Sequence, residues 1–255
     1  MSSDSPLNSP EARQAALRSR AAAGEPLSLA ALAEEFGVSA DTIRRDLLVL
    51  EAEGALRRVR GGALPVAPPA EPLAARMRRP NLAAGRIAAA ALPLVEDGMV
   101  LMLDGGTTVA HLVAGLPPLP RALVVTPSPA VATSTLAAGI ETVLIGGKLS
   151  AFGGISTGAD ACEAIAGVAA DICFLGACGL EAGFGLAADH LDEAAVKRAM
   201  HAASARSVVL AGAEKLGRRA RHRVAACAEL DLLVTDAPPQ DTAALVATGL
   251  EIRHA

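Results

Sequence analysis

Residues 29–50 read LAALAEEFGVSADTIRRDLLVL, and this stretch determines how the N-terminal part of the chain folds. Apolar residues recur at every third or fourth position on both sides of Gly37, which is typical of two short amphipathic helices. Gly37 interrupts the pattern, and Ser39 stands where a helix N-cap is expected. The pattern predicts helices over residues 29–36 and 40–53, joined by a short turn as in a helix-turn-helix.

The segments on either side complete a small unit. Pro10 can open an earlier helix that runs to about Ala23 and stops at Gly24. Residues 56–64 have the pattern of two short strands around the turn Gly61-Gly62. We therefore expect three helices followed by a hairpin.

This arrangement places polar residues where a helix-turn-helix contacts DNA. The N-terminal part of its second helix faces base edges in the major groove, where arginine can bond two guanine acceptors. Arginines of the hairpin would lie beside the phosphate backbone. The predicted DNA-binding residues are Ser39, Asp41, Thr42, Arg44, Arg45, Arg57, Arg58 and Arg60. An ordinary helical hairpin with a solvated arginine face fits the bare pattern too, and we expect Asp46 to pair with an arginine of its own helix.

Proline marks the clearest boundary in the chain, with four prolines between residues 65 and 72. Such a segment cannot sustain a helix or a central strand, and it behaves as a semi-rigid linker. The sequence therefore predicts one domain over residues 1–64, a linker over 65–72 and a second domain over 73–255.

Short apolar runs alternate with alanine-rich stretches in the larger part. The runs are residues 99–103, 122–126, 141–145, 172–176, 207–211 and 231–235, and the stretches 81–94 and 192–204 suit helices. This alternation predicts an α/β domain with a mostly parallel sheet and helices on both faces. The fold class is thus an α/β domain preceded by a small α+β helix-turn-helix domain.

A glycine-rich turn follows the first of these runs and reads Asp104-Gly105-Gly106-Thr107-Thr108. Free backbone N–H groups at a helix start, together with two hydroxyls, can bind an anion. The carboxyl end of a parallel strand is also where such sheets bind ligands. A tight turn with a capped helix explains the same residues equally well.

Other loops of this part carry groups that fit the same site. Lys148 follows a strand and could bring an ammonium to a ligand, and Gly179 lies in a small-residue loop that permits close approach. Asp189, Glu193 and Lys197 are spaced four apart and share one face if the helix includes Asp189. Such a set could hydrogen-bond the hydroxyls and phosphate of a sugar, although an ion-pair ladder, an exposed turn or simple packing remain alternatives.

Composition excludes several classes of protein. The net charge of −4 over 255 residues rules out a strongly basic coat for nucleic acid, while allowing a local basic patch. The four cysteines form no Cys-x-x-Cys pair and have no histidine at metal-ligand spacing, so we expect free thiols, no metal and no cofactor. The polar start lacks a signal peptide and no apolar run can cross a bilayer, so the protein is expected to be soluble and cytoplasmic.

Taken together, these motifs closely resemble the signature of the DeoR family of transcriptional regulators. In the N-terminal part the resemblance lies in Ser39-Ala40-Asp41-Thr42-Ile43-Arg44-Arg45-Asp46-Leu47, in Glu51-x-Glu53-Gly54-x-Leu56-x-Arg58-x-x-Gly61-Gly62-Ala63 and in Arg13. Asp104-Gly105-Gly106-Thr107-Thr108 looks like the family's Asp-x-Gly-Thr-Thr motif, residues 183–197 resemble its Gly-Leu…Asp…Glu…Val-Lys segment, and Lys215 aligns with a lysine near its pocket.

The resemblance implies a winged helix-turn-helix and a sensor domain with the fold of sugar-phosphate isomerases, binding a phosphorylated sugar or related metabolite. It implies effector contacts from Asp104, Gly105, Gly106, Thr107, Thr108, Lys148, Gly179, Asp189, Glu193, Lys197 and Lys215. Three residues depart from the family pattern or vary it. Pro127 replaces a frequent asparagine, Gly212 replaces an aspartate, and Arg86 stands for a lysine. The first two put the usual effector in doubt.

The leading hypothesis is an effector-controlled regulator, more commonly a repressor in this family, that binds a double-stranded DNA operator as a homo-oligomer, a dimer or tetramer. A constitutive DNA-binding protein with a decayed pocket is the alternative. A sugar-phosphate isomerase or deaminase is a weaker one, because no enzyme signature is complete and no catalytic residue is assigned.

Overall fold

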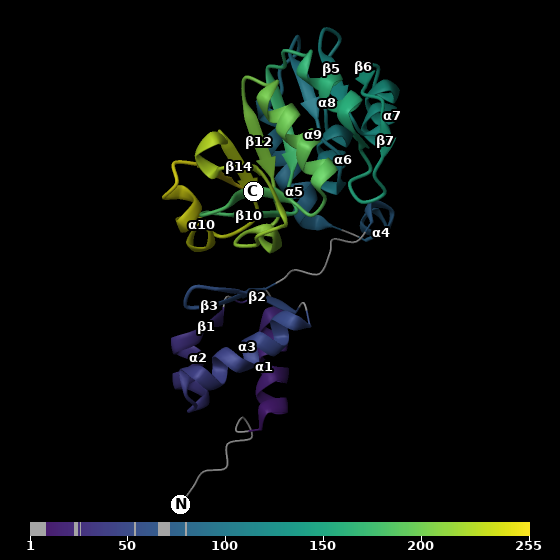
Figure 1. Ribbon diagram of the computed structural model, residues 1–255. Helices are drawn as coiled ribbons and strands as arrows, with labels where there is room; N and C mark the ends of the chain where they lie inside the picture. The colour runs from purple at the N-terminus through teal and green to yellow at the C-terminus, as the bar shows by residue number, and fades with distance from the viewer. Residues whose placement is uncertain (1–8, 23–24, 26, 54, 66–71, 80) are drawn as a thin grey trace, which may run out of the picture. The chain divides into compact units, whose positions relative to one another are not determined.

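The N-terminal unit combines three helices with a small antiparallel sheet. The computed structural model describes residues 9–22, 25, 27–53, 55–65, 72–79 and 81–255 (Figure 1). Contacts divide the chain into two units, residues 1–69 and 70–255. The elements of the first are α1 (Pro10–Ala22), β1 (Leu27–Ser28), α2 (Leu29–Phe36), α3 (Ala40–Ala52), β2 (Leu56–Val59) and β3 (Gly62–Pro65), with the strands in the order β1-β3-β2.

Local signals set the bounds of α2 and α3 as predicted. The Ser28 hydroxyl accepts a hydrogen bond from the backbone N–H of Ala31, and the Ser39 hydroxyl accepts one from Thr42 at 3.2 Å. Gly37 ends α2 in the left-handed conformation at φ 65°, which glycine adopts without strain. The helix-turn-helix and the hairpin are therefore confirmed, while the predicted stops at Gly24 and Gly54 lie outside the described residues.

The expected partner of Asp46 was wrong. Its carboxylate faces α1 and accepts hydrogen bonds from Arg13 at 2.5 Å and from Gln14 at 3.0 Å. The Arg13 and Asp46 side chains are each only 4% exposed, so a buried ion pair joins the first and third helices. Sequence spacing could not reveal it, because 33 positions separate the two residues.

β1 was not predicted. It pairs with β3 and so holds the hairpin of β2 and β3, here called the wing, against the helices. Leu27 pairs with Ala63, and Ser28 pairs with Gly62. A Cβ on Gly62 would collide with the carbonyl oxygen of Leu27, so the two strands approach this closely only because residue 62 has no side chain. Gly62 thus serves the sheet, and Gly61, at φ 89°, makes the turn.

The second unit is built on a parallel sheet of seven strands, in the order β15-β14-β12-β9-β4-β5-β6 (Figure 1). Its strands are β4 (Val100–Leu103), β5 (Leu123–Thr126), β6 (Glu141–Leu144), β9 (Ile172–Gly176), β12 (Ser207–Leu210), β14 (Leu232–Thr235) and β15 (Glu251–His254). The first six confirm the predicted apolar runs. β15 lies at the sheet edge and was missed, because its exposed and half-buried residues form no apolar run.

Helices cover both faces of this sheet, as expected for alternating strands and helices. On one face the core is formed with α8 (Ala159–Ala166), α9 (Leu191–Ala202) and α10 (Pro239–Val246). On the other it is formed with α5 (Leu82–Ala91), α6 (Thr107–Ala114) and α7 (Pro129–Ala137). Successive residues of β4 divide between the faces, since Met102 joins the first core and Leu101 and Leu103 join the second.

Smaller elements surround the sheet. They are α4 (Leu73–Met77), the 3₁₀ turns η2 (Leu92–Leu94), η3 (Ala213–Lys215) and η4 (Cys227–Glu229), the antiparallel pair β7 (Lys148–Leu149) and β8 (Ser156–Thr157), and the antiparallel sheet β10 (Gly179–Glu181), β11 (Gly185–Ala188) and β13 (His222–Ala225). Pro65, the first residue of the predicted linker, ends β3, and residues 66–71 lie outside the described residues. No helix in the described part of the chain is both long and apolar enough to span a membrane.

Candidate functional site

The start of α3 presents the predicted base-contacting residues. Asp41, Arg44 and Arg45 are exposed, and Arg44 forms an ion pair with Asp41 three positions earlier. Thr42 is half-buried, and its hydroxyl lies 2.9 Å from that of Ser39, which caps the helix. Arg45, by contrast, is exposed and forms no ion pair among the described residues.

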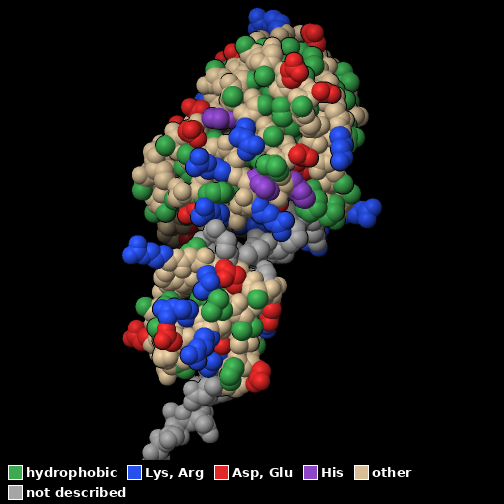
Figure 2. Space-filling model, in the orientation of Figure 1, with side chains coloured by type: hydrophobic (Ala, Val, Ile, Leu, Met, Phe, Trp, Pro, Cys, Tyr) green, Lys and Arg blue, Asp and Glu red, His purple; other side chains and the backbone are tan. Residues whose placement is uncertain are grey.

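The wing carries the other predicted arginines. Arg57 and Arg58 lie in β2, and Arg60 is exposed at the turn. The carboxylate of Glu51 accepts hydrogen bonds from the Arg58 side chain at 2.6 Å and from its backbone N–H at 2.9 Å. Glu51, which sequence reasoning did not single out, thus joins the end of α3 to the wing. Figure 2 shows basic and acidic side chains interspersed on the visible face, in keeping with a local rather than a general basic surface.

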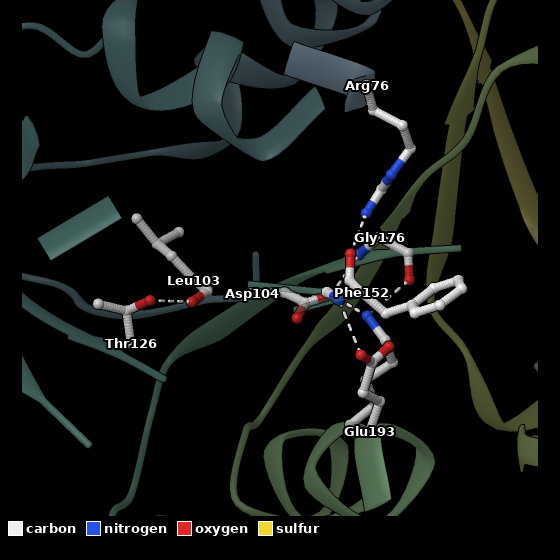
Figure 3. A network of polar contacts seen from close by, with 9 residues as sticks. Arg76, Leu103, Asp104, Thr126, Phe152, Gly176 and Glu193 are labelled. Atoms are coloured by element: carbon white, nitrogen blue, oxygen red, sulfur yellow. Dashed lines mark hydrogen bonds and ion pairs between the residues drawn. The ribbon is translucent and has the colours of Figure 1, made fainter. Parts of the chain in front are cut away.

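In the second unit, the carboxyl ends of three neighbouring strands meet at Asp104. Asp104 follows β4, and its Oδ2 accepts a hydrogen bond from the Gly176 N–H at the end of β9, at 2.8 Å. At the end of β5, the Thr126 hydroxyl donates to the carbonyl of Leu103 at 2.5 Å (Figure 3). The parallel order β9-β4-β5 therefore places the Asp104 turn at the carboxyl ends of the strands, the edge at which parallel sheets commonly bind ligands.

Asp104 forms a buried ion pair with Lys197 of α9. Their side chains are 1% and 8% exposed, and the Lys197 ammonium also donates to the Gly176 carbonyl at 3.1 Å. Burial alone would lower the pKa of Lys197, but the charge of the Asp104 carboxylate and its hydrogen bond outweigh burial and raise it. Lys197 therefore keeps its proton, and its positive charge lies beside the Asp104 carboxylate.

Two buried polar atoms beside this turn have no hydrogen-bond partner among the described residues, Asp104 Oδ1 and Ser128 Oγ. The Ser128 side chain lies 3.6 Å from the position that a Cβ on Gly105 would take, so it borders the same turn. α6 begins directly after the turn, with no side chain capping its N-terminus. A buried carboxylate oxygen and a hydroxyl without partners, beside a helix N-terminus that no side chain caps, are the features of a polar ligand site.

The segment 150–154 forms a loop against the Asp104 turn. The carboxylate of Glu193 accepts hydrogen bonds from the Ser150 hydroxyl and, at 2.7 Å, from the Gly153 N–H. The Gly153 carbonyl lies only 2.7 Å from the position of a Cβ on Gly105, so loop and turn are in close contact. In Figure 3 Glu193 and Phe152 lie beside Asp104. Ser150 was not predicted, since only the fold brings it to Glu193.

The condition under which Asp189, Glu193 and Lys197 would share one helix face is not met. α9 begins at Leu191, so Asp189 precedes the helix. The three side chains have separate partners, because Asp189 pairs with Arg218 at 3.1 Å, Glu193 binds the loop and Lys197 binds Asp104. Arg218 is a half-buried cation that no spacing in the sequence indicated.

Lys215 lies near the same region, in η3. Its side chain is 24% exposed, and its ammonium is 3.9 Å from the Glu214 carboxylate. Burial lowers the pKa of Lys215, and the charges of Arg218 and Arg76 act in the same direction against that of Glu214. A Cβ at residue 212 would lie 2.2 Å from the carboxylate of Glu214, two residues later, which is the exposed end of a flexible side chain.

The remaining predicted residues divide between the site and its surroundings. A Cβ on Gly179 would lie within 2.4 Å of the Arg218 carbonyl, so the glycine permits close packing. Lys148 is exposed at the start of β7 and has no contact with Asp104 among those described. Pro127 is buried, and its carbonyl accepts a hydrogen bond from the Ser156 N–H at 2.7 Å. Among the described residues, no group of three or more His, Cys, Asp or Glu side chains could hold a metal ion.

Comparisons with known proteins match both units. A model of the DeoR-like helix-turn-helix domain matches residues 13–67, and one of the DeoR C-terminal sensor domain matches residues 84–237. The chain is 34% identical to the HTH-type transcriptional regulator GlpR of Haloferax volcanii, over 82% of this chain and 83% of that one. It is 29% identical to the glycerol-3-phosphate regulon repressor of Escherichia coli strain K12, over 87% and 89%.

Among solved structures, ribose 5-phosphate isomerase A of Methanocaldococcus jannaschii resembles the chain at a TM-score of 0.39 and 21% identity, over 52% of this chain and 53% of that one. This likeness is too distant to bear on activity. The two domain models and the relative matched along most of its length agree with the winged helix-turn-helix and the parallel-sheet unit described above, and the chain belongs to the DeoR family of transcriptional regulators.

Proposed function

We propose that this protein is a repressor of carbohydrate-metabolism genes whose DNA binding is controlled by a phosphorylated sugar or polyol. Residues 1–64 bind a double-stranded operator, residues 73–255 bind the effector, and the segment between them links the two. The operator is bound by a homo-oligomer, because a helix-turn-helix reads one half-site and symmetric operators offer two. The relative named as the glycerol-3-phosphate regulon repressor supports this class of effector.

The DNA-binding role is supported by the exposed arginines. In the proposed complex Arg44 and Arg45 contact bases in the major groove, and Arg60 contacts phosphate. Arg44 is paired with Asp41 in the free protein, so it exchanges that carboxylate for a base acceptor on binding. Glu51 keeps the wing in place by holding Arg58.

The observation that carries the effector assignment is the pair of unpartnered buried atoms beside the start of α6, Asp104 Oδ1 and Ser128 Oγ. Free N–H groups at a helix start bind phosphate, whereas a carboxylate oxygen accepts a hydrogen bond from a sugar hydroxyl. One ligand that carries both a phosphate and hydroxyls satisfies all of these groups. Thr107 and Thr108 at the start of α6 supply further hydroxyls.

An isomerase or deaminase would need a free carboxylate base against the substrate. The carboxylates of Asp189 and Glu193 are both engaged, since Asp189 pairs with Arg218 and Glu193 holds Ser150 and Gly153. We therefore propose regulation and not turnover, with no cofactor and no catalytic residue.

Fluorescence anisotropy on the DNA upstream of the gene, with and without a panel of sugar and polyol phosphates, tests the proposal. We expect sequence-preferring binding that one phosphate weakens. Ser128→Ala should reduce the response to that phosphate and leave DNA binding unchanged, whereas Ser134→Ala, whose hydroxyl bonds within its own helix, should respond normally. Binding that no phosphate alters would contradict effector control and favour a decayed pocket.

A further inference from the structure

The loop over the Asp104 turn is held from two sides. On one side Glu193 of α9 binds Ser150 and Gly153. On the other side α4 binds the two residues between them, since the Leu73 N–H donates to the Ala151 carbonyl at 3.2 Å and the Arg76 guanidinium donates to the Phe152 carbonyl at 2.7 Å (Figure 3). The loop therefore joins the sensor site to α4.

Packing reinforces the contact with α4. Gly154 adopts φ 67°, and a Cβ there would collide with the Leu73 side chain, so α4 approaches the loop as closely as a bare glycine allows. The Phe152 ring lies 4.1 Å from that of His190, the N-cap of α9, between ring centroids. α4 also contacts α6, whose N-terminus forms part of the proposed effector site.

The position of α4 in the chain relates the loop to the DNA-binding unit. α4 begins at Leu73, directly after the segment that follows the DNA-binding unit, and it is the first helix of the second unit. A change in the loop therefore reaches the point of the second unit that is nearest in sequence to the DNA-binding unit. Coupling between two sites is carried by an element whose arrangement both sites bias.

We propose that the loop 150–154 is a strap that transmits occupancy of the Asp104 turn to α4, and so regulates DNA binding. A ligand seated at the turn contacts Gly105 and displaces the Gly153 carbonyl, which lies against it. The displacement loosens the bonds from Ala151 and Phe152 to α4. This inference rests on the proposed effector site, but the mechanical link itself is testable without any effector.

Gly105→Ala imitates an occupied turn, because its methyl group would lie 2.5 Å from Ile155 Cγ2 and 2.7 Å from the Gly153 carbonyl oxygen. The experiment is amide hydrogen exchange on the full-length protein in the absence of ligand. We expect exchange in residues 73–77 to rise together with that in 150–154, by at least about fivefold, the lower end of usual coupling between sites. Operator affinity should change in the same variant.

Glu193→Ala provides a second route to the same result, because it releases Ser150 and Gly153 without adding bulk to the turn. Two controls match these variants. Gly146→Ala adds a methyl where no atom lies within 4 Å, and Asp192→Ala removes an exposed carboxylate next to Glu193. Neither control should change exchange in residues 73–77.

If amide hydrogen exchange increases only in residues 150–154 in both Gly105→Ala and Glu193→Ala, the proposal that the loop acts as a strap is wrong. If Gly105→Ala fails to fold, Glu193→Ala and Leu73→Ala decide the matter, since Leu73→Ala should raise exchange in the loop from the α4 side. A panel of phosphates that fails to bind would refute the proposed effector, and it would leave the exchange result unaffected. The two proposals therefore fail separately.

Discussion

Among the described residues, an ion pair with both side chains buried joins Arg13 to Asp46 in the first unit and Asp104 to Lys197 in the second. Burying charges costs free energy of solvation, and breaking such a pair leaves an uncompensated charge in the core. The two pairs differ in whether both oxygens of the carboxylate have hydrogen-bond partners. Hydrogen bonds are assigned to both oxygens of Asp46, whereas Asp104 Oδ1 has no partner among the described residues. We interpret the first as structural and the second as the anchor of a ligand site.

Replacing Asp46 with Ala tests the first interpretation. The change removes the carboxylate that faces the Arg13 guanidinium, which is 4% exposed, and we expect it to lower the free energy of unfolding of the N-terminal unit by about 3–5 kcal/mol. Urea unfolding followed through this unit measures the loss. Asp41→Ala is the control, because that carboxylate is 71% exposed and its pair with Arg44 should be worth at most about 1 kcal/mol. Equal stabilities of the two variants would contradict a structural role for the pair.

Because of Lys215, we expect the free energy of unfolding of the second unit to depend on pH. Burial first, and then the charges of Arg218 and Arg76, lower its pKa below the ordinary 10.5 despite the opposing charge of Glu214. In the unfolded chain the lysine keeps its proton to higher pH, so the unfolded state binds more protons between the lowered pKa and 10.5. The unfolding free energy contributed by Lys215 should therefore rise with pH across that window and be lost as pH falls through the lowered pKa.

Lys215→Met is the comparison for this effect. Its stability relative to the natural protein should be greatest below the lowered pKa and should decline as pH rises, since the methionine carries no buried charge. Urea unfolding at several pH values gives the difference, and Lys148→Met, at an exposed lysine, should show none of this dependence. A difference that is constant with pH would show that Lys215 titrates at its ordinary value.

At the scale of elements, we propose that α3 contacts the bases of DNA and that the wing contacts its phosphates. Arg44→Ala and Arg45→Ala should each weaken specific binding by about 1–3 kcal/mol if the side chain reads a base. Arg60→Ala should weaken binding to all sequences alike and reduce the salt slope by about 1, as expected of a phosphate contact. Anisotropy titrations at several salt concentrations separate the two kinds of loss. Unchanged specific affinity in both helix variants would refute the assignment of α3 as the recognition helix.

The wing depends on Gly62. An alanine there would collide with the Leu27 carbonyl and separate β1 from β3, while α3, which has its own caps, remains folded. We therefore expect Gly62→Ala to lower operator affinity without loss of helical circular dichroism. Gly85→Ala, with no atom within 4 Å of the added methyl and in the middle of α5, is the neutral control. Normal operator affinity in Gly62→Ala would mean that the wing makes no contribution.

The elements that the sequence predicted are those with local causes. Ser39 and Gly37 bound the helix-turn-helix whatever surrounds it, and buried strands such as β9 are runs of apolar residues in any context. β1 and β15 have two and four residues with few or no buried side chains, so their pairing depends on a neighbour supplied by the fold. Helices and strands were therefore predictable where the periodicity of apolar residues and helix caps determine them. They were not predictable where a strand forms only because it pairs with a neighbouring strand.

The same distinction applies to the whole molecule. The Asp104 turn was predictable because a strand, two glycines and a helix start are adjacent in sequence. Its partners were not, since Lys197 is 93 positions away and the Gly176 N–H is 72 positions away. Sequence spacing suggested that Glu193 and Lys197 act together, yet the fold sends one to the loop and the other to Asp104. Long-range contacts of this kind decide which polar groups are left for a ligand.

At the largest scale the proposal of a homo-oligomer makes a prediction about the operator. One winged helix of this size presents few base contacts, so tight specific binding needs a second copy on a second half-site. Two linked binding events gain affinity only when both half-sites face the protein together. Inserting about 5 base pairs between the half-sites turns one of them by roughly half of the 10-base-pair helical turn, and should weaken binding by about 100-fold.

Inserting about 10 base pairs returns both half-sites to the same side of the DNA helix and should recover a large part of the lost affinity. The comparison separates the effect of the relative rotation of the half-sites from that of the distance between them. Anisotropy on the three operators gives the affinities, and sedimentation of the complex gives the number of chains bound. Equal affinity for all three spacings, with one chain per operator, would contradict the oligomer. A strap that moves α4 would then have to act on a single DNA-binding unit, and the effector would change its affinity for one half-site alone.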